Sequence, residues 1–407
     1  QRARKDHQVG KRLGSIIQRS ARLMMAADWT HTNLLAPLQR VMLADSLATD
    51  GAGRHVEQVE IIFSNTLTAE KITAAWRELV EQTEALRIGF VINAGNLIGW
   101  EFASESEISI QQNLPISWKN WLSDDSVNPL LISRKTPWRV VYWPAARRFV
   151  WTFHHALLDG RSITRILRNF IKTLAAEPKE FLARSLWREP TSSQVALAEA
   201  MFCGVGDTQF STAQIPERFL VCGRAIRCLG DNFTIALGSS AVERNVTIAT
   251  ILTWAWGQVL IEFFAEKCVI FEQVRCGAPQ VTSAGFIMNT LPVLAKRDES
   301  VAEMRSQLQT LRAIESVSLS ERFRDSSVLM IEHGTLDHWV RDADGKSLIE
   351  SVTLHESEGD GLMATASILP NLRLEVEGPG RFELLEQWVL CLKNFIRTPA
   401  LDGRSTD

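Results

Sequence analysis

Residues Val150–Ser162 read VWTFHHALLDGRS, and the rest of the chain can be placed around this stretch. The apolar run Phe149–Phe153 predicts a buried strand, two adjacent histidines follow it, and a helical pattern begins after Gly160. A strand, a sharp loop and the start of a helix form a rigid scaffold on which side chains can converge. We therefore expect the chemistry of this protein, if it is an enzyme, to lie in this loop.

The polar residues of the loop predict unequal roles. Neighbours along a strand point to opposite faces, so one of His154 and His155 can face a cleft while the other packs. An imidazole with a pKa near 6.5 can accept a proton at neutral pH. Asp159 could orient a histidine, or it could brace the turn by pairing with an arginine. Gly160 permits a backbone conformation or a close approach that a Cβ atom would block.

The totals describe an ordinary globular protein of 407 residues, long enough for two or three domains or two lobes. The net charge of -3 gives no argument for nucleic-acid binding. Residues 1–29 form a basic leader that lacks the apolar core of a signal peptide. Six cysteines at irregular spacings predict free thiols in a reducing compartment, hence a cytoplasmic protein. The most apolar stretch, 248–264, is shorter than the ~20 residues of a membrane span and predicts a buried helix.

Several other site classes lack their signatures. A serine hydrolase commonly needs G-x-S-x-G, which is absent, and no phosphate-binding P-loop is present. The segment 359–364 fits G-x-G-x-x-A but precedes a strand-like run, which argues against a dinucleotide site. We expect no metal site, because the remaining histidines form no i,i+4 pair on a helix. They are His7, His31, His55, His333, His338 and His355.

The periodicity of the chain predicts a mixed α/β (α+β) fold with largely antiparallel or mixed sheets. Residues 103–136 read as irregular, with Trp118 and Trp121 as anchors, and the proline-containing segment 177–216 reads as a linker between lobes. The expected helices cover 37–48, a segment from Thr68, a segment after Gly160, 193–203, 247–264, 300–315 and 382–396. The expected strands cover 56–63, 86–92, 97–102, 138–143, 149–154, 218–228, 232–237, 268–274, 327–333, 348–355, 362–369 and 372–377.

Four segments together resemble a known family. His154–Gly160 resembles the H-H-x-x-x-D-G signature of the condensation domains of nonribosomal peptide synthetases, which share the chloramphenicol-acetyltransferase-like fold. Residues 36–43 (APLQRVML) are similar to the first motif of that family, and residues 84–90 (EALRIGF) to the end of its second motif. Residues 285–292 (GFIMNTLP) are similar to the motif that ends in N-T-L-P. The resemblance runs from about residue 30 to 397.

The resemblance implies two chloramphenicol-acetyltransferase-like lobes arranged in a V around a central active-site tunnel. It implies an N-terminal lobe over 30–190 that carries the histidine motif, and a C-terminal lobe over 191–400. A floor loop at about 280–296 and a latch at about 355–378 would cross between the lobes.

Site roles follow from the same resemblance. His155 matches the catalytic histidine, which would deprotonate or position the nucleophile, whereas His154 would be structural. Asp159 would hold the loop through a salt bridge, with Arg87 as the expected partner, and Gly160 would keep the backbone clear of the thioester. Ser162 and Asn289 are assigned to the substrate tunnel.

The implied reaction forms an amide or ester bond from an acyl thioester and an amine or alcohol acceptor. The chain itself would bind no cofactor, because the acyl group arrives on the phosphopantetheine of an acyl or peptidyl carrier protein, or on coenzyme A. The acceptor is a small molecule or a carrier-bound group. Both a stand-alone protein and a part of a multidomain synthetase fit the sequence, and we expect no membrane span.

Departures from the family pattern keep two alternatives open. Gln82-Thr83 replaces the Arg-His of the second motif, and Arg161 stands where an aromatic residue is usual. One alternative is a stand-alone acyltransferase that uses acyl-coenzyme A. The other is a catalytically degenerate, condensation-like docking domain, which the retained His155 argues against.

Overall fold

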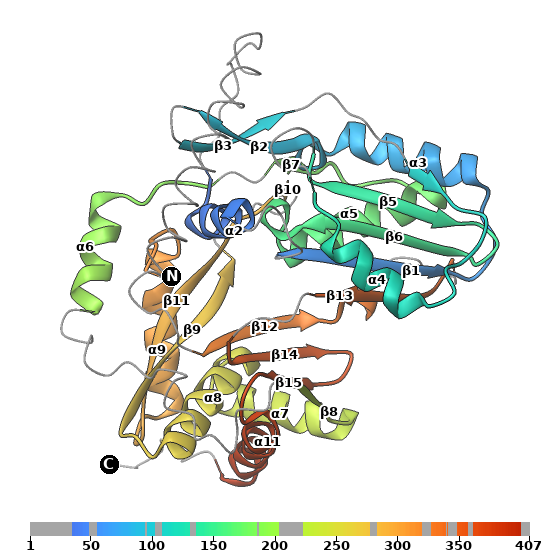
Figure 1. The fold of residues 1–407 in the computed structure, drawn as a ribbon. Helices are drawn as coiled ribbons and strands as arrows, with labels where there is room; N and C mark the ends of the chain where they lie inside the picture. Colours follow the sequence, from blue (N-terminus) through green and yellow to red (C-terminus); the bar gives the residue numbers. More distant parts are fainter. Residues whose placement is uncertain are drawn as a thin grey trace, which may run out of the picture. The chain divides into compact units, whose positions relative to one another are not determined.

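The computed structural model describes residues 35–48, 55–93, 96–101, 108–130, 136–184, 187–202, 223–276, 283–319, 327–338, 340, 348–356 and 361–399. The basic leader 1–29, residues 185–186 and 203–216 of the segment 177–216, and the start of 359–364 lie outside the described residues. The helices are α2 (Pro37–Ala48), α3 (Ala69–Gln82), η2 (Glu84–Arg87), α4 (Trp118–Val127), η3 (His155–Leu157), α5 (Gly160–Leu174), α6 (Ser192–Met201), α7 (Asp231–Glu243), α8 (Ile248–Phe264), α9 (Val301–Leu311), η7 (Arg312–Ile314) and α11 (Arg381–Arg397). The strands are β1 (Val56–Phe63), β2 (Ile88–Asn93), β3 (Asn96–Glu101), β4 (Ile108–Ile110), β5 (Trp138–Trp143), β6 (Arg148–His154), β7 (Ala183–Arg184), β8 (Arg224–Cys228), β9 (Cys268–Cys276), β10 (Ser283–Ala284), β11 (Met288–Lys296), β12 (Val328–Gly334), β13 (Ile349–His355), β14 (Met363–Leu369) and β15 (Arg373–Glu377) (Figure 1).

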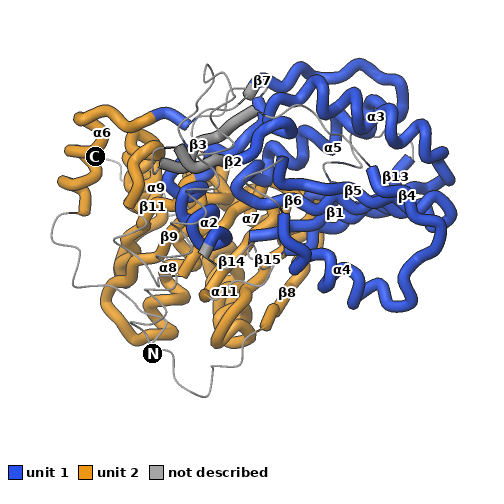
Figure 2. The backbone as a smooth tube through the Cα atoms, turned by 45° about the horizontal axis from the view of Figure 1, so that its top comes forward, with its two compact units in different colours: residues 1–188, 278–288, 336–357 blue, residues 189–277, 289–335, 358–407 orange. Residues whose placement is uncertain are grey.

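The chain divides into two compact units that are discontinuous in sequence. Unit 1 comprises Gln1–Arg188, Ala278–Met288 and Leu336–Ser357, and unit 2 comprises Glu189–Gly277, Asn289–Thr335 and Glu358–Asp407 (Figure 2). Two segments of the second half of the chain therefore return to unit 1. The sequence gives no local sign of these returns. The lobe bounds 30–190 and 191–400 stay a prediction.

Unit 1 is built on a sheet with the strand order β13-β1-β6-β5-β4 among the described residues. Helices α3 and α5 cover one face, and Trp76 of α3 is fully buried there. Its ring centroid lies 5.3 Å from that of Trp151 on β6 and 5.2 Å from that of Phe170 on α5. The predicted one-sided apolar faces of both helices are confirmed, since the residues of those faces are buried. Burial of these faces against the sheet stabilises the two helices.

The opposite face of this sheet carries a buried polar network under α4. The carboxylate of Asp125 accepts hydrogen bonds from Gln58 and Thr152 and pairs with Arg139 at 2.7 Å. Helix α4 lies in the segment 103–136, which the sequence predicts to be irregular. The prediction fails because α4 buries none of its residues fully and shows no apolar stripe, so its contacts with the sheet are polar and aromatic.

Unit 2 packs helices against a sheet with the strand order β11-β9-β12-β14-β15-β8 in its described part. The core helix α8 buries Trp256 beside Trp388 of α11, with ring centroids 5.0 Å apart. Within the described residues no single helix is long and apolar enough to cross a membrane; α7 and α8 satisfy that test only as a pair bent by 98°.

One predicted strand of unit 2 is wrong. Residues 232–237 alternate apolar and polar side chains, which indicates a strand, but they form the first turns of α7. Leu237, Ser240 and Ala241 are the buried residues of this helix, and their spacing follows a helical face. Ser240 is a polar member of this face, so the apolar pattern alone hides the helical period.

The segments that return to unit 1 pair with its strands. Strand β13 lies antiparallel to β1, with Val59 opposite Leu354, and β10 lies parallel to β7. Strands β14 and β15, in the range 355–378 where the latch is expected, pair with each other inside the sheet of unit 2, and the latch stays a prediction. Residues 336–357 belong to unit 1. Both strands alternate apolar residues, so strand pairing, not local pattern, decides their places.

Candidate active site

The loop after β6 is held by helix α2. His154 ends β6, and its Nε2 lies 2.8 Å from the hydroxyl of Ser46 while its Nδ1 accepts a hydrogen bond from the backbone N–H of Ala156. Gln39 donates from its side-chain amide to the Ala156 carbonyl at 2.8 Å. Since Nδ1 accepts, the ring proton of His154 lies on Nε2 and is donated to Ser46. These bonds explain why the segment 36–43 accompanies the histidine motif.

His154 is a neutral structural residue. Only 2% of it is exposed. Burial, together with the neighbouring His55 and His155, lowers the pKa of His154 from 6.5 to about 3. An imidazole that stays neutral and uses both nitrogens for hydrogen bonds positions the loop and has no site left for a substrate.

His155 faces a different environment. Its Nδ1 lies 3.0 Å from Oε1 of Glu57 on β1, an ion-pair distance, although the ring N–H does not point at the oxygen well enough for a regular hydrogen bond. One fifth (20%) of the side chain is exposed, and the ring packs edge-on against Phe286. Burial lowers the pKa of His155, but the carboxylates of Glu57, Glu356 and Asp159 outweigh it, so the pKa is raised.

The expected ion pair between Asp159 and Arg87 is corrected by the structure. Asp159 caps the N-terminus of α5: Oδ1 accepts from the backbone N–H of Ser162 at 2.9 Å, and Oδ2 accepts from that of Ile287 at 3.3 Å. Arg87 instead donates to the carbonyls of Val80 and Glu81. Both carboxylate oxygens of Asp159 are occupied by backbone donors, which satisfy a buried charge without an arginine.

The two residues assigned to a substrate tunnel, Ser162 and Asn289, both make structural contacts. Ser162 is 2% exposed, and its hydroxyl bonds to both the N–H and the carbonyl of Gly285, whose φ of 151° favours glycine. Asn289 is 1% exposed and donates to the carbonyls of Glu315 and Val317, each at 2.9 Å. These bonds hold the backbone of neighbouring segments, and the assignment of Ser162 and Asn289 to a substrate tunnel stays a prediction.

Gly160 begins α5 outside the left-handed region of φ, so no backbone conformation demands a glycine there. A Cβ atom at this position would meet nothing within 4 Å. The sequence suggests two possible reasons for Gly160, a special backbone conformation and a close approach that a Cβ atom would block. Only the close approach of another molecule is left, and it stays a prediction.

The sequence prediction missed Glu57, Gln39 and Ser46. A signal for Glu57 was present: it occupies the same face of β1 as Val59 and Ile61, which are core residues. A carboxylate on a core face requires a partner, and such residues are candidates for functional sites. Gln39 and Ser46 lie on an ordinary helix, and only their contacts with the loop reveal their role.

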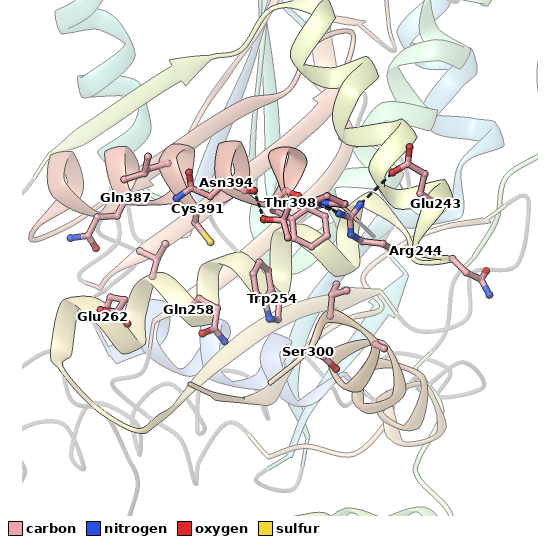
Figure 3. A pocket seen from close by; sticks show the side chains of 17 residues that line it. Glu243, Arg244, Trp254, Gln258, Glu262, Ser300, Gln387, Cys391, Asn394 and Thr398 are labelled. Carbon is pink, nitrogen blue, oxygen red and sulfur yellow. Dashed lines mark hydrogen bonds and ion pairs between the residues drawn. The ribbon is translucent and has the colours of Figure 1, made fainter. Parts of the chain in front are cut away.

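A separate cavity of about 940 Å³ lies in unit 2, among α7, α8, α9 and α11 (Figure 3). Trp254, Phe395 and Leu390 supply apolar lining, and Arg244 stacks over the Phe395 ring at 4.6 Å. Arg244 also donates to the carbonyls of Ser240, Phe395 and Thr398, so its charge caps helix ends. None of the site residues predicted from the sequence lines this cavity. In the described part of the chain, no group of three or more His, Cys, Asp or Glu residues is arranged to hold a metal ion.

The chain is similar in sequence to large peptide synthetases. It is 25% identical over 307 residues to one linear gramicidin synthase protein of Brevibacillus parabrevis, an alignment that covers 64% of this chain. It is 24% identical over 377 residues to another linear gramicidin synthase protein of the same organism, which covers 81% of this chain. The chain spans only 6% and 5% of the length of these two relatives. No protein-family model matches it.

Solved structures of condensation domains share the architecture. The condensation domain of the monacolin K polyketide synthase matches with a TM-score of 0.68 at 13% identity, over 91% of this chain and 98% of that one. The starter condensation domain of rhizomide synthetase matches with a TM-score of 0.65 at 14% identity, over 90% of this chain and 96% of that one. The resemblance inferred from the sequence is thereby confirmed: the chain has the fold of the condensation domains of nonribosomal peptide and polyketide synthetases.

Proposed function

We propose that the chain is a condensation-type acyltransferase of nonribosomal peptide synthesis. It would join an acyl or aminoacyl group, presented as a thioester on a carrier protein, to an amine acceptor, or to an alcohol with formation of an ester. The observation that carries the proposal is the unequal pair of histidines within this fold. His154 is buried and neutral, whereas His155 is partly exposed and paired with a carboxylate through Nδ1.

The proposed reaction needs one proton carrier. The acceptor nitrogen attacks the thioester carbon, a C–N bond forms and the C–S bond breaks. The proton lost by the nitrogen passes to Nε2 of His155 and then to the departing sulfur, so the products are an amide and the thiol of the carrier. Holding both substrates beside this nitrogen would convert a bimolecular step into one within a complex.

The partners belong to the same proposal. The phosphopantetheine arm of an acyl or peptidyl carrier protein would present the donor, and the chain would work in the cytoplasm within, or together with, a multidomain synthetase. The similarity to the linear gramicidin synthase proteins supports this, because each of them is many times longer than the matched region.

Two other functions predict different behaviour. A stand-alone acyltransferase would turn over free acyl-coenzyme A as readily as a loaded carrier. A docking domain without activity would bind the carrier but not require His155. The partial exposure of the His155 ring and its ion-pair distance to Glu57 favour the enzyme, because a docking surface has no need for an activated imidazole.

The test compares the parent with His155→Ala on a panel of acyl-loaded carrier proteins and amine acceptors, with product detection by mass spectrometry. We expect product from the parent and a loss of at least about 100-fold in the variant, the lower range for removing a general acid–base group. Equal rates would exclude the assigned role of His155. Product from acyl-coenzyme A at the rate seen with carriers would favour the stand-alone enzyme.

A further inference from the structure

We infer that Glu57 is the positioning residue of this active site: it holds the Nδ1 edge of His155 and so leaves Nε2 as the nitrogen that exchanges a proton with the substrates. The inference rests on the proposed acyl transfer for its catalytic meaning. The contact between Glu57 and His155 is a property of the structure and can be tested without turnover.

The placement of Glu57 supports this role. Glu57 lies on β1 opposite Phe153 of β6, directly before the histidines, and its side chain is 8% exposed. Oε1 lies 3.0 Å from Nδ1 of His155, and Oε2 is buried without a hydrogen-bond partner. Among the residues that the structure describes, no other basic group forms an ion pair with Glu57. A buried carboxylate with a single ion-pair partner depends on that partner staying in place.

The other ionisable groups around His155 cannot replace Glu57. Both oxygens of Asp159 accept backbone N–H groups, so this carboxylate is fixed as a helix cap. Glu356 follows β13 and is exposed to solvent, which screens its charge. His154 is neutral at physiological pH, so it has no charge with which to assist proton transfer at Nε2 of His155. Glu57 alone combines burial with contact to the ring.

The contact has two consequences for the reaction. A carboxylate beside Nδ1 favours the tautomer with the proton on Nδ1, which leaves the lone pair on Nε2. The same charge stabilises the imidazolium that forms when Nε2 takes the proton of the attacking amine. The imperfect angle of the contact fits a resting site, since hydrogen bonds of catalytic groups often align only when substrate is bound.

The experiment titrates the His155 ring by NMR, with ring nitrogens labelled in the full chain, and measures kcat and KM against pH. Glu57→Gln keeps the shape of the side chain and removes its charge, and Glu57→Asp keeps the charge on a shorter stem. We expect Glu57→Gln to lower the pKa of His155 by roughly one unit or more, as removal of an adjacent charge does. The acid limb of kcat should move the same way and kcat should fall roughly 10- to 100-fold, with KM nearly unchanged. Glu57→Asp should restore part of the pKa of His155 and part of kcat.

Glu60→Gln is the matched control. Glu60 lies on the same strand but on the other face, where it pairs with Arg148 at 2.7 Å and with His355 at 2.9 Å. Its replacement also disturbs a buried ion pair of β1, but it should leave the titration of His155 unchanged. An equal shift in both variants would reduce Glu57 to a structural residue and overturn the inference. So would an unchanged His155 titration in Glu57→Gln.

The two hypotheses fail in distinguishable ways. If the parent forms no product with any loaded carrier or acyl-coenzyme A, the proposed function is rejected, and the NMR titration still decides whether Glu57 holds the ring. If the parent forms product and the ring titrates as expected, but Glu57→Gln keeps its kcat profile, then the positioning role is rejected and the acyltransferase stands.

Discussion

Acidification should destabilise unit 1 through His154. The folded protein holds this ring neutral between Ser46 and Ala156, with a pKa of about 3 against an ordinary value of 6.5. Between those two values the unfolded chain binds a proton that the folded chain does not. Stability from His154 is therefore complete above about pH 6.5 and decreases as the pH falls toward 3.

The magnitude follows from the lowered pKa. One unit below the unfolded pKa, at about pH 5.5, protonation of the unfolded chain is favoured by about 1.4 kcal/mol, and folded His154 is still neutral. His155 has the opposite sign, because its pKa is raised: its contribution is full below the unfolded pKa and is lost as the pH rises through the folded one. A direct comparison of the parent at two pH values would mix these effects.

A variant separates the two histidines. His154→Gln can still donate to Ser46 but cannot titrate, and His155 is present in both proteins. We expect the parent to be more stable than the variant at about pH 7.5, and the gap to narrow by about 1.4 kcal/mol at about pH 5.5. Urea unfolding followed by tryptophan fluorescence, and checked by circular dichroism, measures the gap. A gap that stays constant over this range would refute the neutral, buried state of His154.

Three further substitutions test packing around the loop and the core. Asp159→Ala removes the cap of α5 and the acceptor of Ile287 and should cost about 1–2 kcal/mol in urea unfolding; an unchanged midpoint would contradict the capping role. Gly160→Ala should change the unfolding free energy by less than about 0.5 kcal/mol, since its Cβ meets no atom within 4 Å. The same variant should slow acyl transfer if a thioester passes close to Gly160. Full activity would contradict the role of Gly160 in keeping the backbone clear of the thioester. Gly257→Ala would place a Cβ atom 2.4 Å from that of Ala295 and should lower the unfolding free energy by about 1–3 kcal/mol. A melting temperature equal to that of the parent would disprove this expectation.

The sequence by itself determined the local structure around the motif. The apolar run before His154 and the amphipathic pattern after Gly160 define a strand, a loop and a helix through contacts between near neighbours. The order of four motif segments identified the fold, which the matches to solved condensation domains confirm. These features are readable because periodicity depends on residues only a few positions apart.

Only the tertiary structure decided which distant groups meet. It paired His155 with Glu57, gave both oxygens of Asp159 to backbone donors in place of Arg87, and placed β13 beside β1. The side chains of a strand alternate with a period of two whatever its partner, so sequence pattern does not select the partner strand. A buried charge likewise takes whichever donor the packing brings within reach, and that choice is made by segments far apart in the chain.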